Sequence, residues 1–285
     1  MRLIDHETSA LYTESQSWWN DAFTNLLLEC IPASAKHVVE IGCGVAKAAH
    51  ALLPSLPEAE YVGISAVPDL VNTAKKHLEG KAYADRANVR LGSLADLPLP
   101  DSVSDVALSL MSLQHSPLAE EAFREAHRVL KTGGKVIVVE PDNLGQRFYF
   151  DGVLEAVNMA FHQLMLRVRV IRQPADIALG PRVASMLQTT GFLGVRMVVH
   201  AVHSSRAEPA KDFFERLKKI AQRTASHAGL DSSCEELAAC EEAINRSMFS
   251  GMPQRVGFSC HVVPVFRVDA TSVEMTPSGS FPKQP

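Results

Sequence analysis

Two glycines that follow a short apolar stretch have the spacing of a ligand-binding turn. The segment HVVEIGCGVAKAAH, residues 37–50, reads as a buried strand, a turn through Gly42 and Gly44, and the start of a helix. Glycine lets the backbone turn sharply and lets a ligand approach without a Cβ in the way. The helix that follows directs its free N–H groups towards the same place. We therefore expect a ligand near residues 40–46, although a tight turn without a ligand is the alternative that two glycines alone leave open.

Polar and aromatic residues farther along the chain are candidates for contact with a substrate. His115 stands just after a predicted strand, where it is either a general base or substrate-orienting group, or a pocket wall or helix cap. The segment EPDNLGQRFYFDG, residues 140–152, places polar groups beside aromatic rings. That mixture suits a small-molecule pocket, and it equally suits the start of an amphipathic helix. The candidate catalytic residues are His115 and Tyr149, and the candidate substrate contacts are Tyr12, Trp19, Asn143, Arg147 and Phe148.

No metal site is expected from the spacing of the histidines and cysteines. His200 and His203 fall on opposite faces of a predicted strand, so we do not expect the two to share a metal ion. Arg169 and Arg172 share a helix face, where they would bind an anionic substrate group or form an ordinary solvated surface. The five cysteines are scattered and odd in number, which indicates reduced thiols.

Strands and helices alternate through the first half of the chain, and this alternation must position the candidate residues. Such spacing is typical of a Rossmann-like, doubly wound, mostly parallel sheet, here of seven strands. Helical insertions would form a cap over the substrate. Strands are predicted at 37–44, 59–65, 88–93, 103–111, 135–141 and 195–202, with a late strand or strand pair at 257–270; helices are predicted over much of 1–30 up to Pro32, from Pro68 to 78, at 118–131 closed by Gly133 and Gly134, in 151–190, at 208–229 and at 233–248.

Bulk composition narrows the class of partner. The formal net charge is −4 and the pI is near 6.3, without the basic surface that RNA or DNA binding requires. No apolar run approaches the roughly 18 residues of a membrane span. Residues 1–16 are polar and acidic, unlike a secretory signal, so we expect a cytoplasmic protein. A homodimer is compatible with this composition.

Four segments occur in order at the spacing of one α/β domain: EIGCGVA, YVGISAVPDLV, GSLADLPLPDSVSDVALS and EAHRVLKTGGKVIVVEP. Together they resemble the class I S-adenosylmethionine-dependent methyltransferases, particularly the small-molecule enzymes related to ubiquinone and sterol methyltransferases. The resemblance covers residues 37–141 strongly and 180–203 weakly. LPLPDSVSDVALS followed by EAHRVLKTGGKV is much more specific than the glycines.

The resemblance implies S-adenosylmethionine as the cofactor and a role for each matching position. Glu40 would help to hold the methionine amino group. The other implied contacts are Gly42, Cys43 and Gly44 beneath the methionine and ribose, Ile64, Ser65 and Ala66 at the ribose hydroxyls and adenine edge, Ser93 and Leu94 at the adenine amino group, and Leu110 and Met111 along the cofactor.

Three positions depart from the family's pattern. Ala46 replaces the usual third glycine, which adds one tolerable methyl group. Ser65 stands where an Asp or Glu usually accepts both ribose hydroxyls, and a serine hydroxyl cannot accept both in bidentate fashion. The change would weaken cofactor affinity about tenfold, or roughly 1–2 kcal/mol. Ser93 replaces an Asp that commonly accepts the adenine amino group.

The resemblance favours a methyltransferase that acts on an oxygen, nitrogen or carbon atom of a small molecule. One alternative is an enzyme that uses the same cofactor for cyclisation, elimination or decarboxylation. The other is a non-catalytic protein that keeps the fold without the cofactor. We expect a single domain at 1–270, with lid helices at 1–36, the cofactor core at 37–141, cap segments at 151–190 and 208–249, and a flexible tail at 271–285.

Overall fold

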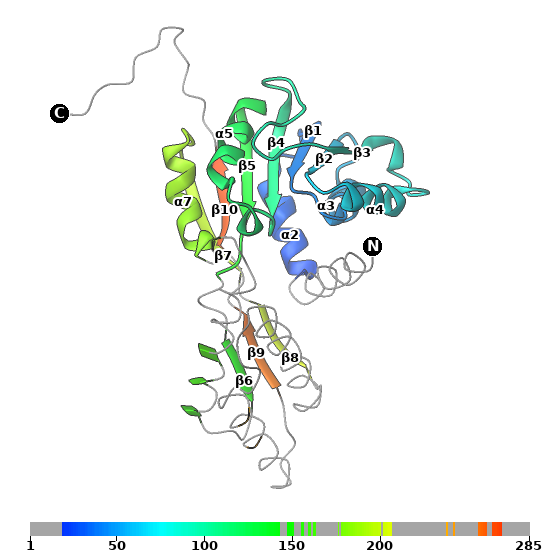
Figure 1. Cartoon of the computed structure of the whole chain (residues 1–285). Coiled ribbons are helices and arrows are strands. Elements are labelled where there is room, and N and C mark those ends of the chain that lie inside the picture. Colours follow the sequence, from blue (N-terminus) through cyan, green and yellow to red (C-terminus); the bar gives the residue numbers. More distant parts are fainter. Residues whose placement is uncertain are drawn as a thin grey trace, which may run out of the picture.

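A mostly parallel sheet of seven strands forms the centre of the fold (Figure 1). This computed structural model describes residues 19–142 and 178–200, the backbone of the strands at 147–150, 202–206, 256–260 and 264–269, and isolated positions at 155, 156, 159, 160, 162, 163, 176, 238 and 242. The strands lie in the order β3 (Ala87–Leu91), β2 (Glu60–Ser65), β1 (His37–Ile41), β4 (Ser104–Leu110), β5 (Leu130–Val139), β10 (Pro264–Asp269) and β7 (Val195–Val199). The first five run parallel, and β10 runs antiparallel to both of its neighbours. The predicted doubly wound α/β class is therefore confirmed.

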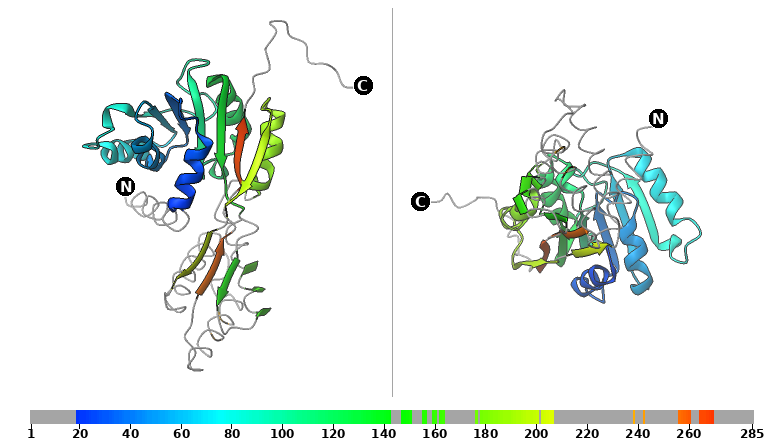
Figure 2. Two further views of the ribbon diagram at one scale, coloured as in Figure 1. Left: turned by 180° about the vertical axis from the view of Figure 1, so that it is seen from behind. Right: turned by 90° about the horizontal axis from the view of Figure 1, so that it is seen from below.

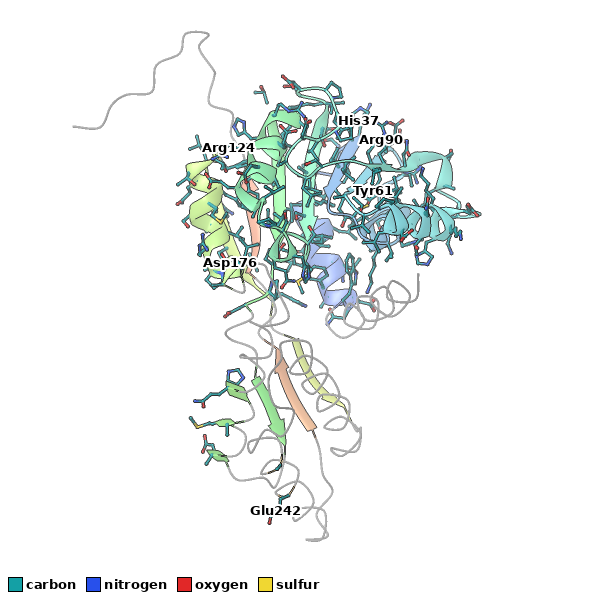
Figure 3. All side chains as sticks on the ribbon, in the orientation of Figure 1. His37, Tyr61, Arg90, Arg124, Asp176 and Glu242 are labelled. Atoms are coloured by element: carbon teal, nitrogen blue, oxygen red, sulfur yellow. The ribbon has the colours of Figure 1, made fainter. Side chains whose placement is uncertain are left out.

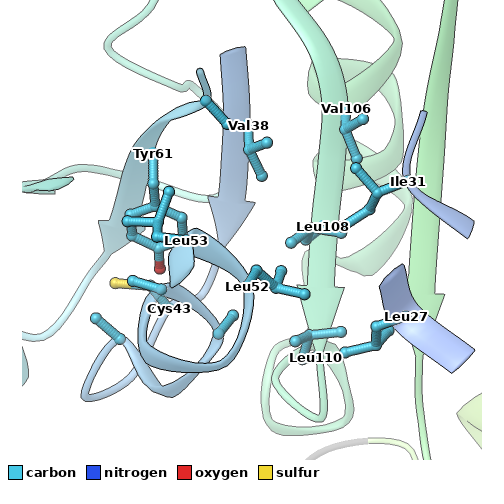
Figure 4. Packing of buried hydrophobic residues seen from close by; sticks show 14 of the residues in the cluster. Leu27, Ile31, Val38, Cys43, Leu52, Leu53, Tyr61, Val106, Leu108 and Leu110 are labelled. Atoms are coloured by element: carbon cyan, nitrogen blue, oxygen red, sulfur yellow. The ribbon is translucent and has the colours of Figure 1, made fainter. Parts of the chain in front are cut away.

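Helices cover both faces of this sheet (Figure 2). On one face, α2 (Asp21–Cys30), α3 (Lys47–Leu52) and α4 (Pro68–Leu78) bury apolar side chains against the sheet. On the other, α5 (Ala119–Val129) and α7 (Leu179–Thr189) do the same. Alternate residues of the central strands serve the two layers, as a period of two requires. Figure 4 shows the first layer, in which Leu27 and Ile31 pack near Leu108 and Leu110 of β4.

A second sheet is antiparallel, and three of its strands lie among the described residues: β6 (Arg147–Phe150), β9 (Val256–Cys260) and β8 (Val202–Arg206). The sequence predicts a strand-end loop that lines a pocket, or a helix start, around 147–150; the structure has a strand there instead of a loop or a helix, and the pocket role stays a prediction. RFYF is rich in aromatic side chains, which favour a paired strand. The late segment at 257–270 was predicted as a strand or strand pair, and it forms a pair, although its two members join different sheets.

Local signals placed some helix ends correctly and misplaced another. Pro68 is the first residue of α4, and α2 ends one residue before Ile31, ahead of Pro32, as predicted. The glycine pair does not end the next helix, because α5 already stops at Val129. Gly133 and Gly134 lie inside β5, where the pairing with β4 shifts register. A glycine with φ of 79° allows that irregularity.

Helix α7 falls within the segment predicted as part of a substrate cap. Leu179, Val183 and Leu187 are buried against the sheet, so this helix belongs to the main layers and not to a cap. Most of the two predicted cap segments, together with the tail at 271–285, lies outside the described residues. Among the described helices, none has both the length and the apolar character to span a membrane.

Candidate functional site

The turn after β1 is built around two glycines with positive φ, Gly42 at 79° and Gly44 at 52°. The N–H groups of Gly42 and Cys43 both donate to the carbonyl of Ile64 at 2.9 Å, which fixes the turn against the end of β2. A methyl group added to Gly44 would meet no atom of the described residues within 4 Å. The turn is thus held on one side and open on the other, as a ligand cradle must be.

The loop after β4 contacts the same turn through Ser112. A Cβ on Gly42 would lie 2.3 Å from the Ser112 Oγ and 3.9 Å from the Leu94 Cδ1. Only glycine permits so close an approach. The Ser112 hydroxyl donates to the carbonyl of Ile41 at 3.0 Å. Ser112 is therefore a structural member of the site that the sequence analysis missed, and Leu94, predicted at the adenine amino group, has a side-chain atom near the turn.

Glu140, at the end of β5, holds the loop that carries His115. Its carboxylate accepts hydrogen bonds from the N–H of Leu113 at 2.7 Å and of Gln114 at 3.3 Å. The carboxyl group is fully buried, and this burial raises its pKa to about 8 against the lowering effect of the backbone donors. His115 lies exposed at the end of the short helix η3 (Leu113–His115). An acidic residue at the end of the apolar stretch KVIVV was the signal that could have identified Glu140.

Glu40 lies buried beneath the glycine turn, where its carboxylate accepts a hydrogen bond from the Tyr61 hydroxyl. Burial raises the pKa of Glu40 to about 8, although the Tyr61 bond lowers it. Burial and the Glu40 charge raise the pKa of the Cys43 thiol. Figure 4 shows Cys43 beside Tyr61, and Figure 3 labels Tyr61 within this layer of the domain. A cation near the turn would stabilise the ionised form of Glu40.

The ends of β2 and β3 form a different corner. Ser65 is buried, and its Oγ accepts the N–H of Val67 at 3.2 Å. The Oγ of Ser93 accepts the N–H of Ala95 at 3.1 Å in the same way. Both hydroxyls therefore stabilise local turns. Val67, two residues after Ser65, is 46% exposed, so the corner presents hydrocarbon next to the position at which the family's pattern has a carboxylate.

The remaining predicted site residues divide into three groups. Ile64 and Leu110 lie near the carboxyl ends of β2 and β4, at the edge of the sheet where they were expected, but their side chains are buried in the core. Ala66 is exposed and Met111 partly buried; Met111 has a φ of 58° and donates its N–H to the carbonyl of Val139 at 2.6 Å. Tyr12 and Asn143 lie outside the described residues, and only the backbone of Arg147, Phe148 and Tyr149 is described, in β6.

A row of side chains that the sequence did not connect runs from the turn to the far edge of the sheet. The Lys47 ammonium lies 4.9 Å from the centre of the Trp19 ring, and burial lowers the Lys47 pKa to about 8. The rings of Trp19 and Phe23 are 5.1 Å apart, and those of Phe23 and His200 are 5.5 Å apart. Trp19 is thus placed beside the first residue of α3, next to the turn. The part of the chain that the structure describes contains no cluster of three His, Cys, Asp or Glu side chains that would hold a metal.

Comparison with known proteins agrees with this arrangement. Residues 39–138 match the family described as a methyltransferase domain. The chain is 28% identical over 122 residues to a ubiquinone/menaquinone biosynthesis C-methyltransferase from Dinoroseobacter shibae; the match covers 43% of this chain and 48% of that relative. It is 26% identical over 172 residues to a demethylmenaquinone methyltransferase from Lactiplantibacillus plantarum, covering 57% of this chain and 73% of the relative. The YcgJ protein of Bacillus subtilis shares the fold, with a TM-score of 0.53 at 16% identity over 87% of this chain and 98% of its own.

Proposed function

The chain belongs to the class I S-adenosylmethionine-dependent methyltransferase family, and from that premise we propose that it transfers the methyl group of S-adenosylmethionine to a small molecule. The observation that carries the proposal is the glycine turn, which is open at Gly44 while the end of β2 and the loop after β4 hold it in place.

The residues of the turn fit this cofactor in shape and in charge. We place the methionine portion at the open side of Gly44, where an added methyl group would meet no atom of the described residues within 4 Å. Glu40 beneath the turn is a buried carboxyl group with a raised pKa, and the positive charge of the cofactor's ammonium group would favour its ionised form. When bound, the cofactor supplies a methyl group on a positively charged sulfur.

Positioning is the main task left to the protein, because methyl transfer needs a nucleophile in line with the bond that breaks. Glu140 fixes Leu113 and Gln114, and through them the place of His115 at the edge of the sheet. An acceptor that is protonated at neutral pH must lose a proton as it gains the methyl group. His115 is our candidate for receiving that proton, and Tyr149 is the second.

The connections between the two sheets support an acceptor site beyond the carboxyl ends of the strands. Strand β6 follows β5, β8 follows β7, and β9 precedes β10. Because β10 is antiparallel to its neighbours, all three connections leave the main sheet at the edge where β1 and β4 end. Figures 1 and 2 show the small sheet beyond this edge. The small sheet is therefore our candidate for one wall of the acceptor site.

Two measurements test the proposal. Calorimetric titration with S-adenosylmethionine and S-adenosylhomocysteine should show binding, and no binding at millimolar ligand overturns the proposal. With an acceptor in the mixture, the product should be heavier by one methylene, and one S-adenosylhomocysteine should form for each product molecule. Turnover that consumes no cofactor would instead assign the chain to non-methylating chemistry.

A further inference from the structure

Tyr61 of β2 brings a hydroxyl group into the apolar layer beneath the glycine turn. Its side chain is buried in a cluster that includes Leu52 and Leu53. A buried hydroxyl needs a hydrogen-bond partner, because leaving it unpaired is costly. The Tyr61 hydroxyl finds that partner in Glu40, near the end of β1, and donates a hydrogen bond to its Oε2 atom. A phenylalanine at position 61 would fill the same apolar space, so the hydroxyl serves Glu40 and not the packing of the layer.

Gly63 leaves the space that this pair occupies. It lies opposite Glu40 in the register of β1 and β2. A Cβ on Gly63 would lie 2.8 Å from the Tyr61 hydroxyl oxygen and 2.8 Å from the Cys43 Sγ. Figure 4 shows that hydroxyl beside Cys43, which stands between the two glycines of the turn. The hydroxyl, the carboxyl group and the turn are therefore packed as one unit.

No cation among the described residues contributes to the pKa of Glu40. The titratable groups that interact with it are the Tyr61 hydroxyl and the Cys43 thiol, and neither of them is positively charged. Burial raises the Glu40 pKa to about 8, although the Tyr61 bond lowers it, so the carboxyl group keeps its proton at neutral pH. A buried carboxyl group with one fixed oxygen and no cation is prepared to ionise when a cation arrives from outside.

We propose that Tyr61 is a positioning residue for cofactor binding: its hydroxyl fixes the carboxyl group of Glu40 beneath the turn, and this carboxyl group releases its proton to solvent as the cofactor's ammonium group binds. The inference rests on the proposed function, because the glycine turn must hold the methionine portion. The hydrogen bond from Tyr61 becomes stronger once its acceptor is ionised. Tyr61 therefore favours the ammonium-bound state without contacting the cofactor.

Proton release is the most direct test and needs no variant. S-adenosylhomocysteine and methylthioadenosine are titrated calorimetrically at pH 7 in two buffers that differ in ionisation enthalpy. The second compound lacks the amino acid portion and hence the ammonium group. Because the Glu40 pKa is about 8, most of one proton should leave with S-adenosylhomocysteine, and none with methylthioadenosine. S-adenosylhomocysteine should also bind several-fold more tightly as the pH rises towards 8.

Tyr61→Phe keeps the ring and removes only the hydroxyl. Its affinity for S-adenosylhomocysteine at pH 7 should fall about tenfold, the value of one hydrogen bond to a charged group, whereas its affinity for methylthioadenosine stays within about twofold. The rise of affinity with pH should move to higher pH, because the Glu40 carboxyl group has lost its donor. Tyr83→Phe is the matched control. It removes a hydroxyl that bonds to His50 Nδ1 at 2.6 Å in the same layer, and it should leave both affinities unchanged.

Glu40→Gln shows whether Tyr61 acts through Glu40. This variant should release no proton, and adding Tyr61→Phe to it should weaken S-adenosylhomocysteine binding by less than about twofold more. Equal weakening of both ligands in Tyr61→Phe would assign Tyr61 to structure alone and overturn the inference, as would unchanged binding in that variant. Binding without proton release in the wild type also overturns the inference and leaves the proposed function in place. Failure of the wild type to bind S-adenosylhomocysteine overturns the proposed function, and this inference with it.

Discussion

The two halves of the sheet edge are constructed differently. At the ends of β1, β4 and β5, buried groups tie one loop to another: Ser112 bonds to Ile41 beside Gly42, and Glu140 binds the backbone of the loop after β4. At the ends of β2 and β3, the hydroxyls of Ser65 and Ser93 each bond to a backbone N–H two residues on.

The difference between the two halves coincides with how closely the sequence matches the methyltransferase family's pattern. Where the sequence keeps the pattern, in EIGCG, side chains and backbone hold an open cradle in place. Where the sequence departs from it, at Ser65 and Ser93, the hydroxyl oxygen accepts a hydrogen bond from a nearby backbone N–H. We infer that cofactor affinity comes mainly from the first half of the edge, and the variants below test this division.

The largest effect is expected from Gly42→Ala. The added Cβ would lie 2.3 Å from the Ser112 Oγ, and alanine is strained at a φ of 79°. We expect the free energy of unfolding to fall by about 3 kcal/mol and S-adenosylmethionine binding to become undetectable by calorimetry.

Gly80→Ala is the matched control for this variant. Gly80 has a φ of 71°, but its added methyl would meet no atom within 4 Å. It should cost only the backbone strain, about 1 kcal/mol, with unchanged cofactor affinity. Equal losses in the two variants would show that the contact between the turn and Ser112 contributes nothing.

The second prediction concerns the pH dependence of stability through Glu140. In the unfolded chain its proton leaves near pH 4.5, whereas in the folded chain the pKa is about 8. Between these values the folded state binds more protons than the unfolded state. The stabilisation that Glu140 contributes is therefore fully present below pH 4.5 and is lost as the pH rises through 8. Urea unfolding at pH 5.5 and 8.5 should show a loss of about 2–3 kcal/mol attributable to this group.

Glu140→Gln should remove that share of the pH dependence, because the amide resembles the protonated acid at every pH. Glu125→Gln serves as its control. The Arg128 hydrogen bond lowers the pKa of Glu125, so Glu125 contributes stability that is lost only as the pH falls towards and below its ordinary value of 4.5. An undiminished slope in Glu140→Gln would show that Glu140 does not titrate in this range.

The parts of the fold that the sequence predicted are those with local signals. Five parallel strands and α4 beginning at Pro68 followed from periodicity and proline chemistry. The register shift at Gly133 could not be predicted, because the same glycine pair also suits a helix end. The small sheet was missed because β6 pairs with β9, more than a hundred positions later in the chain.

The candidate site shows the same limit. The glycine turn, and the serines that stand at positions 65 and 93 in place of carboxylates, could be found from the residue types at matching positions. The roles of Ser112 and Glu140 depend on contacts between segments that are distant in sequence. Such contacts follow from the order of strands in the sheet, which a single sequence does not contain.

A smaller effect is expected from Ser65→Asp, which would restore a carboxylate to the ribose corner. If the ribose lies at the family position, S-adenosylmethionine should bind about tenfold more tightly, since the carboxylate accepts both hydroxyls. Ser65→Ala, which loses only the bond to Val67, is the control and should leave the affinity within about twofold. Unchanged or weaker binding in Ser65→Asp would show that the ribose is held elsewhere.

The smallest effect is expected from Ala46→Gly, the one departure that lies inside the cradle. Ala46 has a φ of 59°, so glycine would relieve about 1 kcal/mol of strain. The methyl group is fully buried, however, and its removal costs about 0.8 kcal/mol. The two terms offset each other, and thermal unfolding should register a change within about 0.5 kcal/mol, with unchanged cofactor affinity. A loss above about 1.5 kcal/mol would mean that packing at Ala46 dominates, whereas a gain of that size would mean that strain does. A change near zero would show that burial of the Ala46 methyl group offsets the backbone strain that arises where the glycine is missing. At Ser65, no group among the described residues takes the place of the missing carboxylate.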